Sequence, residues 1–162
     1  LEKKKVKTKV IWGSAKTTIN WDGDVEVHVL SPIKGADYQD NLNDMSVVIK
    51  VTYGETSLLL TGDAESYAEE LMIASEKELL QGDVLKIGHH GSSTSSSQAF
   101  LDAVQPKAVV ISLGKNNDYG HPHRETMQRL KKLETEIYRT DELGTVRMLF
   151  TESEVRLLKG SK

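Results

Sequence analysis

The sequence predicts an α/β fold in which a mixed sheet carries its helices on one face. Strand-like segments come first along the chain, and apolar runs of strand length then alternate with amphipathic helical segments. Early strands joined by tight turns pair antiparallel, whereas strands separated by helices pair in parallel. No internal repeat breaks this order. We therefore expect a single domain over residues 1–162, with early hairpin strands at 6–30 and an α/β portion at 45–160.

The early part of the chain has the alternation of polar and apolar residues that is typical of half-exposed strands. Short turn sequences containing glycine separate strands expected at 6–12, 17–21 and 25–30. Residues 35–44 are polar and rich in turn formers, so we expect a loop there. A strand at 46–51 follows, and a hairpin turn leads from it into a strand at 57–63.

The remainder of the chain alternates between helix and strand. Apolar residues recur every three to four positions in helices expected at 64–74, 98–104 and 123–133, with a short helical turn at 76–81. Apolar runs between and after them predict strands at 84–87, 108–113, 136–139, 145–149 and 154–158. Because each helix would connect neighbouring strands, we expect the helices to share one face of the sheet.

Composition excludes several classes of protein. The net charge is −3, with 21 basic and 24 acidic residues, so the chain has no overall basic field for nucleic acid. It has no cysteine, which excludes disulfides and thiolate metal sites. No apolar run approaches the length that crosses a bilayer, so we expect no membrane contact by this chain. The hydrophobic fraction of 38% is sufficient for a core.

Two predicted strands end in residues that can bind metal. The strand at 57–63 ends in Gly62-Asp63, and the strand at 84–87 leads into His89 and His90 between two glycines. Ligands of open α/β sheets bind at the carboxyl ends of the strands. Asp63 is also well placed to cap a helix, and a histidine pair can simply be part of a core. In an extended strand end the two histidines would point to opposite faces, so only one would face a given site.

Six hydroxyl residues, Ser92 to Ser97, follow the histidine pair. They precede the helix expected at 98–104, where a serine can cap the first turn. The free N–H groups of a helix start also suit an anion such as phosphate. Both interpretations stay open, and the second predicts that Ser92 to Ser95 present hydroxyl or N–H groups at the edge that carries the histidines.

Four segments together resemble a known family. In order they are LLLTGDAE, DVLKIGHHGSSTSSS, PKAVVISLGKNNDYGHPH and IYRTDELGTV. They are similar to the C-terminal half of a metallo-β-lactamase-fold hydrolase domain, and most similar to the β-lactamase-like domain of the ComEC/Rec2 DNA-internalisation competence proteins. The resemblance extends from about Val25 to Val146. It implies an αββα sandwich, of which this chain would supply one mixed sheet and its outer helices.

The resemblance also implies residue roles. Asp63 matches the carboxylate that bridges two metals, and His89 matches the last metal-binding histidine, so these two are the expected catalytic and metal residues. The residues implied at the substrate-binding rim of the pocket are Asn43, His90, Ser92, His121 and His123. The complete domain would hold two divalent ions, zinc or manganese.

One departure from the family pattern matters as much as the match. The principal metal motif of the family has the form His-x-His-x-Asp-His, or a variant with aspartate in place of a histidine, and lies in the N-terminal half. This chain has histidines only at 28, 89, 90, 121 and 123, and no such cluster. We therefore expect a fragment of a longer protein, inactive alone, whose metal site is completed by the missing N-terminal half of the domain.

The missing half would leave one face of the sheet open. We expect the early strands, residues 6–30, to fold over part of that face and any uncovered remainder to drive self-association. The side chains expected on this face are Val47, Ile49, Leu58, Leu60, Leu85, Ile87, Val109 and Ile111.

Two classes of function follow from these expectations. The resemblance implies a metal-dependent hydrolase of phosphodiesters, with DNA as substrate during competence, in an extracytoplasmic domain of a bacterial membrane protein. The alternative is a non-catalytic structural or nucleic-acid-binding module, for which the missing metal motif would be a genuine loss. A hydrolase of small phosphoesters is a third possibility.

Overall fold

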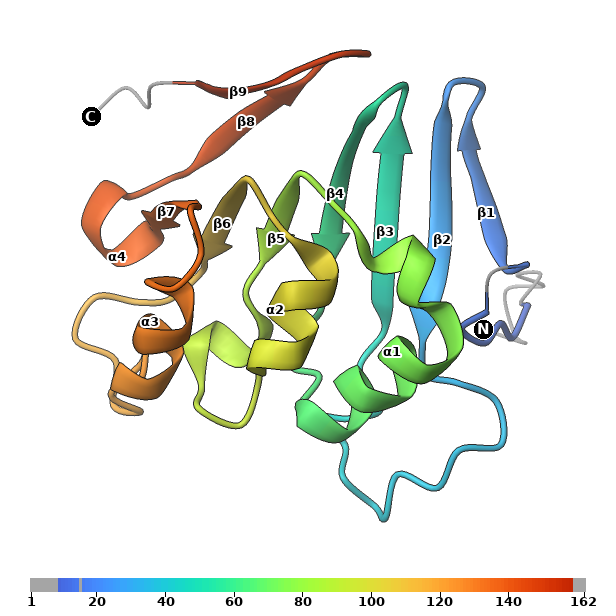
Figure 1. Cartoon of the computed structure of the whole chain (residues 1–162), viewed down its shortest axis with the longest axis horizontal. Coiled ribbons are helices and arrows are strands. Elements are labelled where there is room, and N and C mark those ends of the chain that lie inside the picture. Colours follow the sequence, from blue (N-terminus) through green and yellow to red (C-terminus); the bar gives the residue numbers. More distant parts are fainter. Residues whose placement is uncertain (1–8, 15, 159–162) are drawn as a thin grey trace, which may run out of the picture.

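The computed structural model describes residues 9–14 and 16–158, and its centre is a seven-stranded mixed sheet whose strands follow chain order (Figure 1). The strands are β1 (Thr18–Asp22), β2 (Val25–Ser31), β3 (Val48–Tyr53), β4 (Thr56–Leu60), β5 (Val84–Lys86), β6 (Ala108–Ile111) and β7 (Glu136–Arg139). Strands β1 to β4 pair antiparallel, and β4 to β7 pair in parallel. The mixed sheet predicted from the sequence is therefore present.

Helices pack on one face of this sheet (Figure 1). They are α1 (Ser66–Leu80), α2 (Gln98–Val104), α3 (Arg124–Leu130) and the short α4 (Thr140–Leu143), and a 3₁₀ turn, η2 (Gly88–Gly91), follows β5. The helix expected at 64–74 and the turn expected at 76–81 form a single element, α1, with a kink at Glu76. No helix in the described part of the chain combines the length and apolarity that a bilayer crossing requires.

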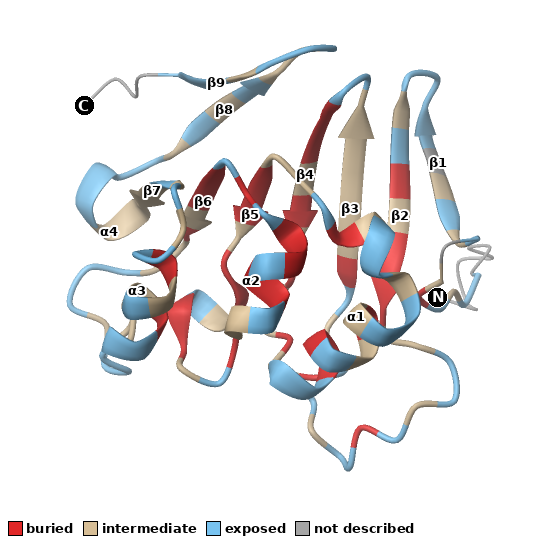
Figure 2. Ribbon diagram, in the orientation of Figure 1, coloured by how far each residue is buried: buried red, intermediate tan, exposed pale blue. Residues whose placement is uncertain are grey.

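The core lies between the sheet and the helices (Figure 2). Its largest fully buried side chains include Leu59, Leu85, Ile87, Ile111, Met72, Phe100, Leu101 and Leu130. Burying one such side chain contributes about 1.5–3 kcal/mol. This corrects the expected face assignment, because Leu85, Ile87, Val109 and Ile111 lie under the helices and not on the open face. Side chains of a strand alternate between the two faces of the sheet, so an error of one residue assigns each of them to the wrong face. The sequence pattern alone does not show which set faces the helices.

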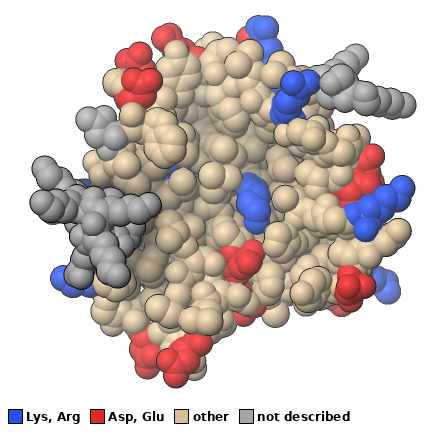
Figure 3. All heavy atoms as spheres, turned by 180° about the vertical axis from the view of Figure 1, so that it is seen from behind, with Lys and Arg blue, Asp and Glu red and all other residues tan. Residues whose placement is uncertain are grey.

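The early strands do not fold over the open face. Instead β1 pairs with β2 and β2 pairs with β3, so they extend the edge of the same sheet. The expectation that they cover the sheet is therefore wrong, while residues 6–8 of that segment lie outside the described residues. The face opposite the helices is mostly uncharged, with a basic and an acidic group near its middle (Figure 3), and Val47 is 63% exposed.

A separate antiparallel hairpin, β8 (Arg147–Phe150) and β9 (Val155–Leu158), closes the chain. Its tip is anchored to the turn before β4, where the Thr56 hydroxyl donates to the Thr151 carbonyl at 2.7 Å. The backbone N–H of Glu55 also donates to the Glu152 carbonyl at 2.6 Å. The hairpin thus sits at the amino ends of the parallel strands, which leaves their carboxyl ends free for a site (Figure 1).

Candidate functional site

The carboxyl ends of β4, β5 and β6 meet at one cavity of about 500 Å³. Asp63 follows β4, His89 and His90 follow β5, and the cavity is also lined by Ser112 after β6. The two loops are tied together, because the His89 backbone N–H donates to the Gly62 carbonyl at 3.1 Å. The structure thus brings Asp63 and His89 to the same edge, as their strand-end positions predicted. Their metal-binding roles stay predictions.

Both histidines line this cavity, contrary to the expectation that only one would face a site. The reason is the backbone of η2, where His89 has φ 46° and His90 has φ 55°, and neither is extended. Left-handed backbone costs about 1–2 kcal/mol per non-glycine residue, so the packing around η2 must hold it. At Gly91 a Cβ atom would lie 2.7 Å from Cβ of Pro122, so the next position has no room for a side chain.

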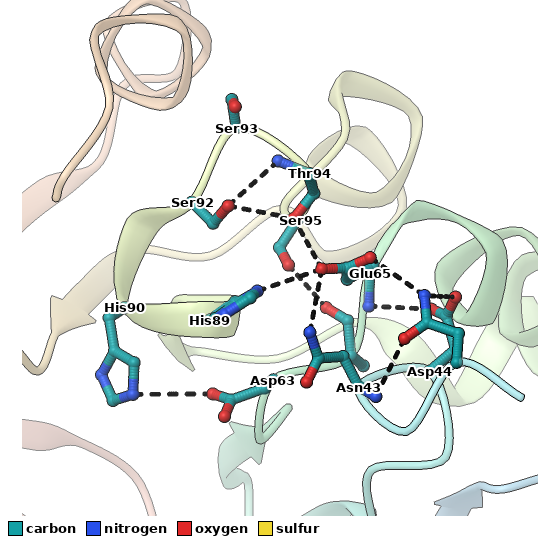
Figure 4. Close-up of polar contacts among 12 residues, drawn as sticks. Asn43, Asp44, Asp63, Glu65, His89, His90, Ser92, Ser93, Thr94 and Ser95 are labelled. Carbon is teal, nitrogen blue, oxygen red and sulfur yellow. Dashed lines mark hydrogen bonds and ion pairs between the residues drawn. The ribbon is translucent and has the colours of Figure 1, made fainter. Parts of the chain in front are cut away.

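His90 lines the cavity, and its ring points toward Asp63 (Figure 4). Its Nε2 lies 3.7 Å from Asp63 Oδ1, and its Nδ1 lies 2.6 Å from the Ser112 carbonyl oxygen. A carbonyl oxygen only accepts, so Nδ1 carries a proton. In the neutral ring Nε2 is then an acceptor beside a carboxylate, which is an arrangement suited to binding a cation.

His89 is held from the other side by Glu65, a residue that the sequence analysis did not single out. Nδ1 of His89 lies 3.2 Å from Oε1 of Glu65 (Figure 4). Burial opposes ionisation of Glu65, but hydrogen bonds from Asn41, Asn43 and Thr94, together with the nearby His89, outweigh it and hold the pKa of that carboxyl below its usual value. The only sequence signal was an acidic residue two positions after Asp63, which is also common in the first turn of a helix.

Asn43 and Asp44 build the support behind the cavity. Asn43 donates its side-chain amide to Oε1 of Glu65 at 3.1 Å, so it acts through Glu65 and does not border the cavity. Asp44 is 3% exposed and accepts the backbone N–H groups of Glu65 at 3.0 Å and Ala68 at 3.1 Å. Asp44 therefore caps the start of α1 from a distant loop.

The histidines of the loop before α3 have different surroundings. His121 lines the cavity, and burial, followed by the charges of His123, His89 and His90, lowers the pKa of its imidazole. Nδ1 of His123 accepts the Ser93 N–H at 3.0 Å, so Nε2 carries the proton and donates to the Tyr119 carbonyl at 3.2 Å. Both ring nitrogens of His123 are thus used within the protein, and its contact with substrate stays a prediction.

Ser92, Ser95 and Ser96 of the serine run are buried, whereas Thr94 is exposed. The Ser95 hydroxyl is fully buried and donates to the Ala64 carbonyl at 2.8 Å, and Ser92 is 5% exposed, with its hydroxyl 3.0 Å from that of Thr94. The Ser97 hydroxyl accepts the N–H of Phe100 at 3.2 Å and caps α2. The hydroxyls of Ser92 and Ser95 are thus used within the protein, and the proposed contact of Ser92 with substrate stays a prediction, whereas the helix-cap interpretation is confirmed at Ser97.

Hydrogen bonds from two charged side chains, Glu69 and Arg129, to backbone groups hold the serine run in place. Glu69, which is 1% exposed, accepts the N–H groups of Ser96 at 2.5 Å and Ser97 at 2.8 Å. Burial, the largest cause, raises the pKa of its carboxyl, against those hydrogen bonds and the charge of Arg129. Arg129 in turn donates to the carbonyl groups of Ser95 and Ser96 at 2.7 and 3.1 Å.

Lys86 supports the site from beneath, on the open side of the sheet. Its ammonium donates to the carbonyls of Gly62 at 3.1 Å and Ile87 at 3.0 Å, and so bridges the two loops that carry Asp63 and the histidines. Burial lowers the pKa of this amine, and the charge of Asp63 opposes that shift.

The donor chemistry of the cavity suits a divalent metal, but the set is small. Asp63 offers a carboxylate, and His89, His90 and His121 offer imidazoles. Within residues 9–14 and 16–158, however, no group of three or more such side chains is arranged to hold an ion. These residues fit one side of a metal site, and further ligands would have to come from elsewhere.

Comparisons with known proteins show what the chain is similar to. A family model of the metallo-β-lactamase superfamily matches residues 43–115. The ComE operon protein 3 of Bacillus subtilis is 40% identical over 123 residues, which are 76% of this chain and 16% of that protein. Recombination protein 2 of Haemophilus influenzae is 36% identical over 138 residues, 85% of this chain and 17% of that protein. Competence protein ComA of Neisseria gonorrhoeae is 38% identical over 126 residues, 78% of this chain and 18% of that protein.

The chain therefore spans about one sixth of the length of these relatives. Among solved structures, that of CmlA, a diiron β-hydroxylase from Streptomyces venezuelae, superposes with a TM-score of 0.50 at 15% identity and covers 94% of this chain and 35% of that one. At such identity the likeness shows the fold alone. Together these findings confirm the family resemblance and the fold class predicted from the sequence.

Proposed function

We infer from the place of this chain in the metallo-β-lactamase superfamily, and from its relationship to the ComEC/Rec2 competence proteins, that it is part of a metal-dependent hydrolase that cleaves DNA phosphodiesters. The observation that carries this proposal is the convergence of Asp63, His89, His90 and His121 on one cavity at the carboxyl edge of the sheet. A carboxylate among neutral imidazoles is the ligand chemistry that zinc or manganese accepts.

Asp63, His89 and His90 are the residues that would hold the metal in this half of the domain. Divalent ions in such a site supply an activated water and charge to offset that of the phosphodiester. Burial and the neighbouring histidines lower the pKa of His121 and so favour its neutral form, which can accept a proton from an attacking water. His90 keeps its Nε2 toward Asp63 because the Ser112 carbonyl holds its other nitrogen.

The cavity wall favours DNA over a small ester. Tyr119 lines the cavity, is 78% exposed, and stacks on His121 with 21° between the rings. A flat exposed aromatic surface binds nucleobases, and such stacking contributes about 1–3 kcal/mol per base. The described lining has no lysine or arginine, so the metal ions and the rest of the protein would have to offset the phosphate charge.

We further propose that the open face of the sheet packs against the missing N-terminal half of the domain. Ile49, Leu58, Leu60 and Val110 lie on the side of the sheet away from the helices and are only partly covered. Covering them would remove apolar area from water. Under this proposal the chain alone is inactive and prone to self-association, and the complete domain belongs to a membrane protein and lies outside the cytoplasm.

One observation favours a second candidate, a non-catalytic module. The described residues contain no complete metal-binding group, and loss of the principal motif would leave a fold that binds without cutting. Sequence upstream of residue 1 in the same open reading frame separates the two, because a His/Asp cluster there supports the enzyme.

The decisive experiment uses the full protein encoded by that reading frame. Cleavage of linear DNA and of bis(p-nitrophenyl) phosphate is measured with manganese, with zinc and with a chelator. We expect metal-dependent cleavage of DNA and its loss, by a factor of about 100 or more, in Asp63→Asn. The control is Asp102→Asn, an exposed carboxylate on α2. Unchanged DNA cleavage in Asp63→Asn, or cleavage of the small ester alone, would contradict the proposal.

A further inference from the structure

Glu65 collects hydrogen bonds from three separate segments of the chain (Figure 4). Its Oε1 atom lies 3.2 Å from Nδ1 of His89 and accepts the Thr94 hydroxyl at 2.9 Å and the Asn43 amide at 3.1 Å. Its Oε2 atom accepts the amide of Asn41 at 3.1 Å. The carboxylate is therefore oriented from several directions, and its own backbone N–H is fixed by Asp44 at the start of α1.

In all of these contacts the Glu65 carboxylate acts as a hydrogen-bond acceptor. The amide groups of Asn41 and Asn43 can only donate through their nitrogen atoms, so both carboxylate oxygens act as acceptors. The side chain is 19% exposed and is occupied by these donors, which makes it a poor direct ligand for an ion. Since Oε1 accepts, the proton on the His89–Glu65 hydrogen bond belongs to Nδ1 of His89.

We propose that Glu65 is a positioning residue that fixes the Nδ1–H tautomer and the ring orientation of His89, so that Nε2 stays an acceptor at the cavity. The inference rests on the proposed function, because only a ligand-binding or proton-exchanging histidine needs its free nitrogen defined in advance. A second residue of the same site points the same way. His90 donates Nδ1–H to the Ser112 carbonyl, so an acceptor holds each histidine of the pair at the same ring nitrogen.

The test is the tautomer of His89 in the metal-free chain. Protonated and bare ring nitrogens resonate far apart in long-range ¹H–¹⁵N spectra, and a pH of about 8 keeps an ordinary imidazole neutral. We expect His89 to be protonated at Nδ1 in the unaltered chain. In Glu65→Gln the ratio of Nδ1–H to Nε2–H at His89 should fall roughly tenfold, which is the population change expected for loss of a charge-assisted hydrogen bond.

Two controls separate positioning from general support. The tautomer of His90 should not change in Glu65→Gln, because its acceptor is a backbone carbonyl. Glu70→Gln makes the same chemical change at an exposed position of α1 and should leave both histidines unaltered. Asn43→Ala removes one donor to Glu65 and should lower the melting temperature without changing the His89 tautomer.

Three results would overturn the proposal: Nε2–H as the main tautomer of His89 in the unaltered chain, an unchanged ratio in a folded Glu65→Gln variant, or equal changes at His89 and His90. The first needs no variant, so the test survives if Glu65→Gln fails to fold. Because neither metal nor DNA enters the measurement, failure here is distinct from failure of the proposed hydrolase function.

Discussion

The histidine pair and the serines that follow it are adjacent in sequence, yet their side chains have different surroundings. His89 and His90 line the cavity, whereas Ser92 and Ser95 are buried behind it. The histidines keep one ring nitrogen of each free for a ligand, while the serine hydroxyls are used within the protein. Residues that lie side by side in one glycine-, histidine- and serine-rich stretch thus divide into a part that lines the cavity and a part that supports it.

Two glutamates one helical turn apart hold these two parts. Glu65 contacts His89 at the cavity, and Glu69 accepts the backbone N–H groups that follow Ser95. The pKa of Glu65 is lowered and that of Glu69 is raised, because donors dominate around the first and burial dominates around the second. The same type of residue, glutamate, therefore positions a histidine ring at one place and holds the backbone at the other.

The largest expected effect is on stability, at the serine run. Glu69→Ala should lower the free energy of unfolding by about 3 kcal/mol, because it leaves the N–H of the buried Ser96 and that of Ser97 without acceptors and Arg129 without a nearby opposite charge. Urea denaturation of the chain measures this. Glu70→Ala, on the exposed side of the same helix, is the matched control and should change stability by no more than about 0.5 kcal/mol. Equal effects in the two variants would show that the serine run is held by something else.

The second effect is on binding, at the cavity. Tyr119→Ala in the full protein should weaken the binding of single-stranded DNA by about tenfold, since one base-stacking surface is lost. Tyr119→Phe keeps the ring and should bind normally. Fluorescence anisotropy with a labelled oligonucleotide, and with one that has abasic sites, measures the difference. If the alanine variant discriminates between the two oligonucleotides as well as the unaltered protein does, the stacking role is wrong.

Much of the fold followed from patterns along the chain. The helix expected at 98–104 matches α2, because a serine cap and a compact apolar face fix both of its ends. The strand expected at 136–139 matches β7. The errors arose where tertiary structure decides, namely which face the residues of β5 and β6 adopt and where β1 and β2 pair. A sequence pattern gives the period of a strand but neither its partner nor its phase.

The site was also predictable only in part. Asp63 and the histidine pair were recognisable because strand ends of a parallel sheet share one edge. The orientation of His90 toward Asp63 was not, since it depends on left-handed backbone at two consecutive residues. Glu65 was missed because its importance lies in contacts with Asn41, Asn43 and Thr94, which are distant in the sequence.

The third prediction concerns pH. For Glu69 the folded pKa is raised above the unfolded value, so its contribution to stability is complete below the unfolded pKa and is lost as pH rises through the folded pKa. For Glu65 the folded pKa is lowered, so its contribution is present above the unfolded pKa and is lost as pH falls through the folded pKa. For each variant, Glu65→Gln and Glu69→Gln, the free energy of unfolding is subtracted from that of the unaltered chain at pH values between about 3 and 7. Plotted against pH, the two differences should have slopes of opposite sign. Slopes of the same sign would remove the contrast between the two glutamates.

The smallest expected effect on the fold belongs to the residue with the greatest expected effect on chemistry. The Asp63 side chain is 42% exposed, and Nε2 of His90 lies 3.7 Å from its Oδ1 atom. An exposed pair of this kind contributes about 0–1 kcal/mol, so Asp63→Ala should leave the free energy of unfolding nearly unchanged.

Metal binding should depend on Asp63, although the affinity of this chain for metal should be weak. The described residues lack a complete ligand group, and a closed zinc site needs about four ligands. Calorimetry should therefore find zinc affinity weaker than micromolar, and less again in Asp63→Ala. Micromolar or tighter binding that Asp63→Ala abolishes would mean that His90, His121 or another side chain completes a site within this chain, and that the missing half is not needed to hold the metal.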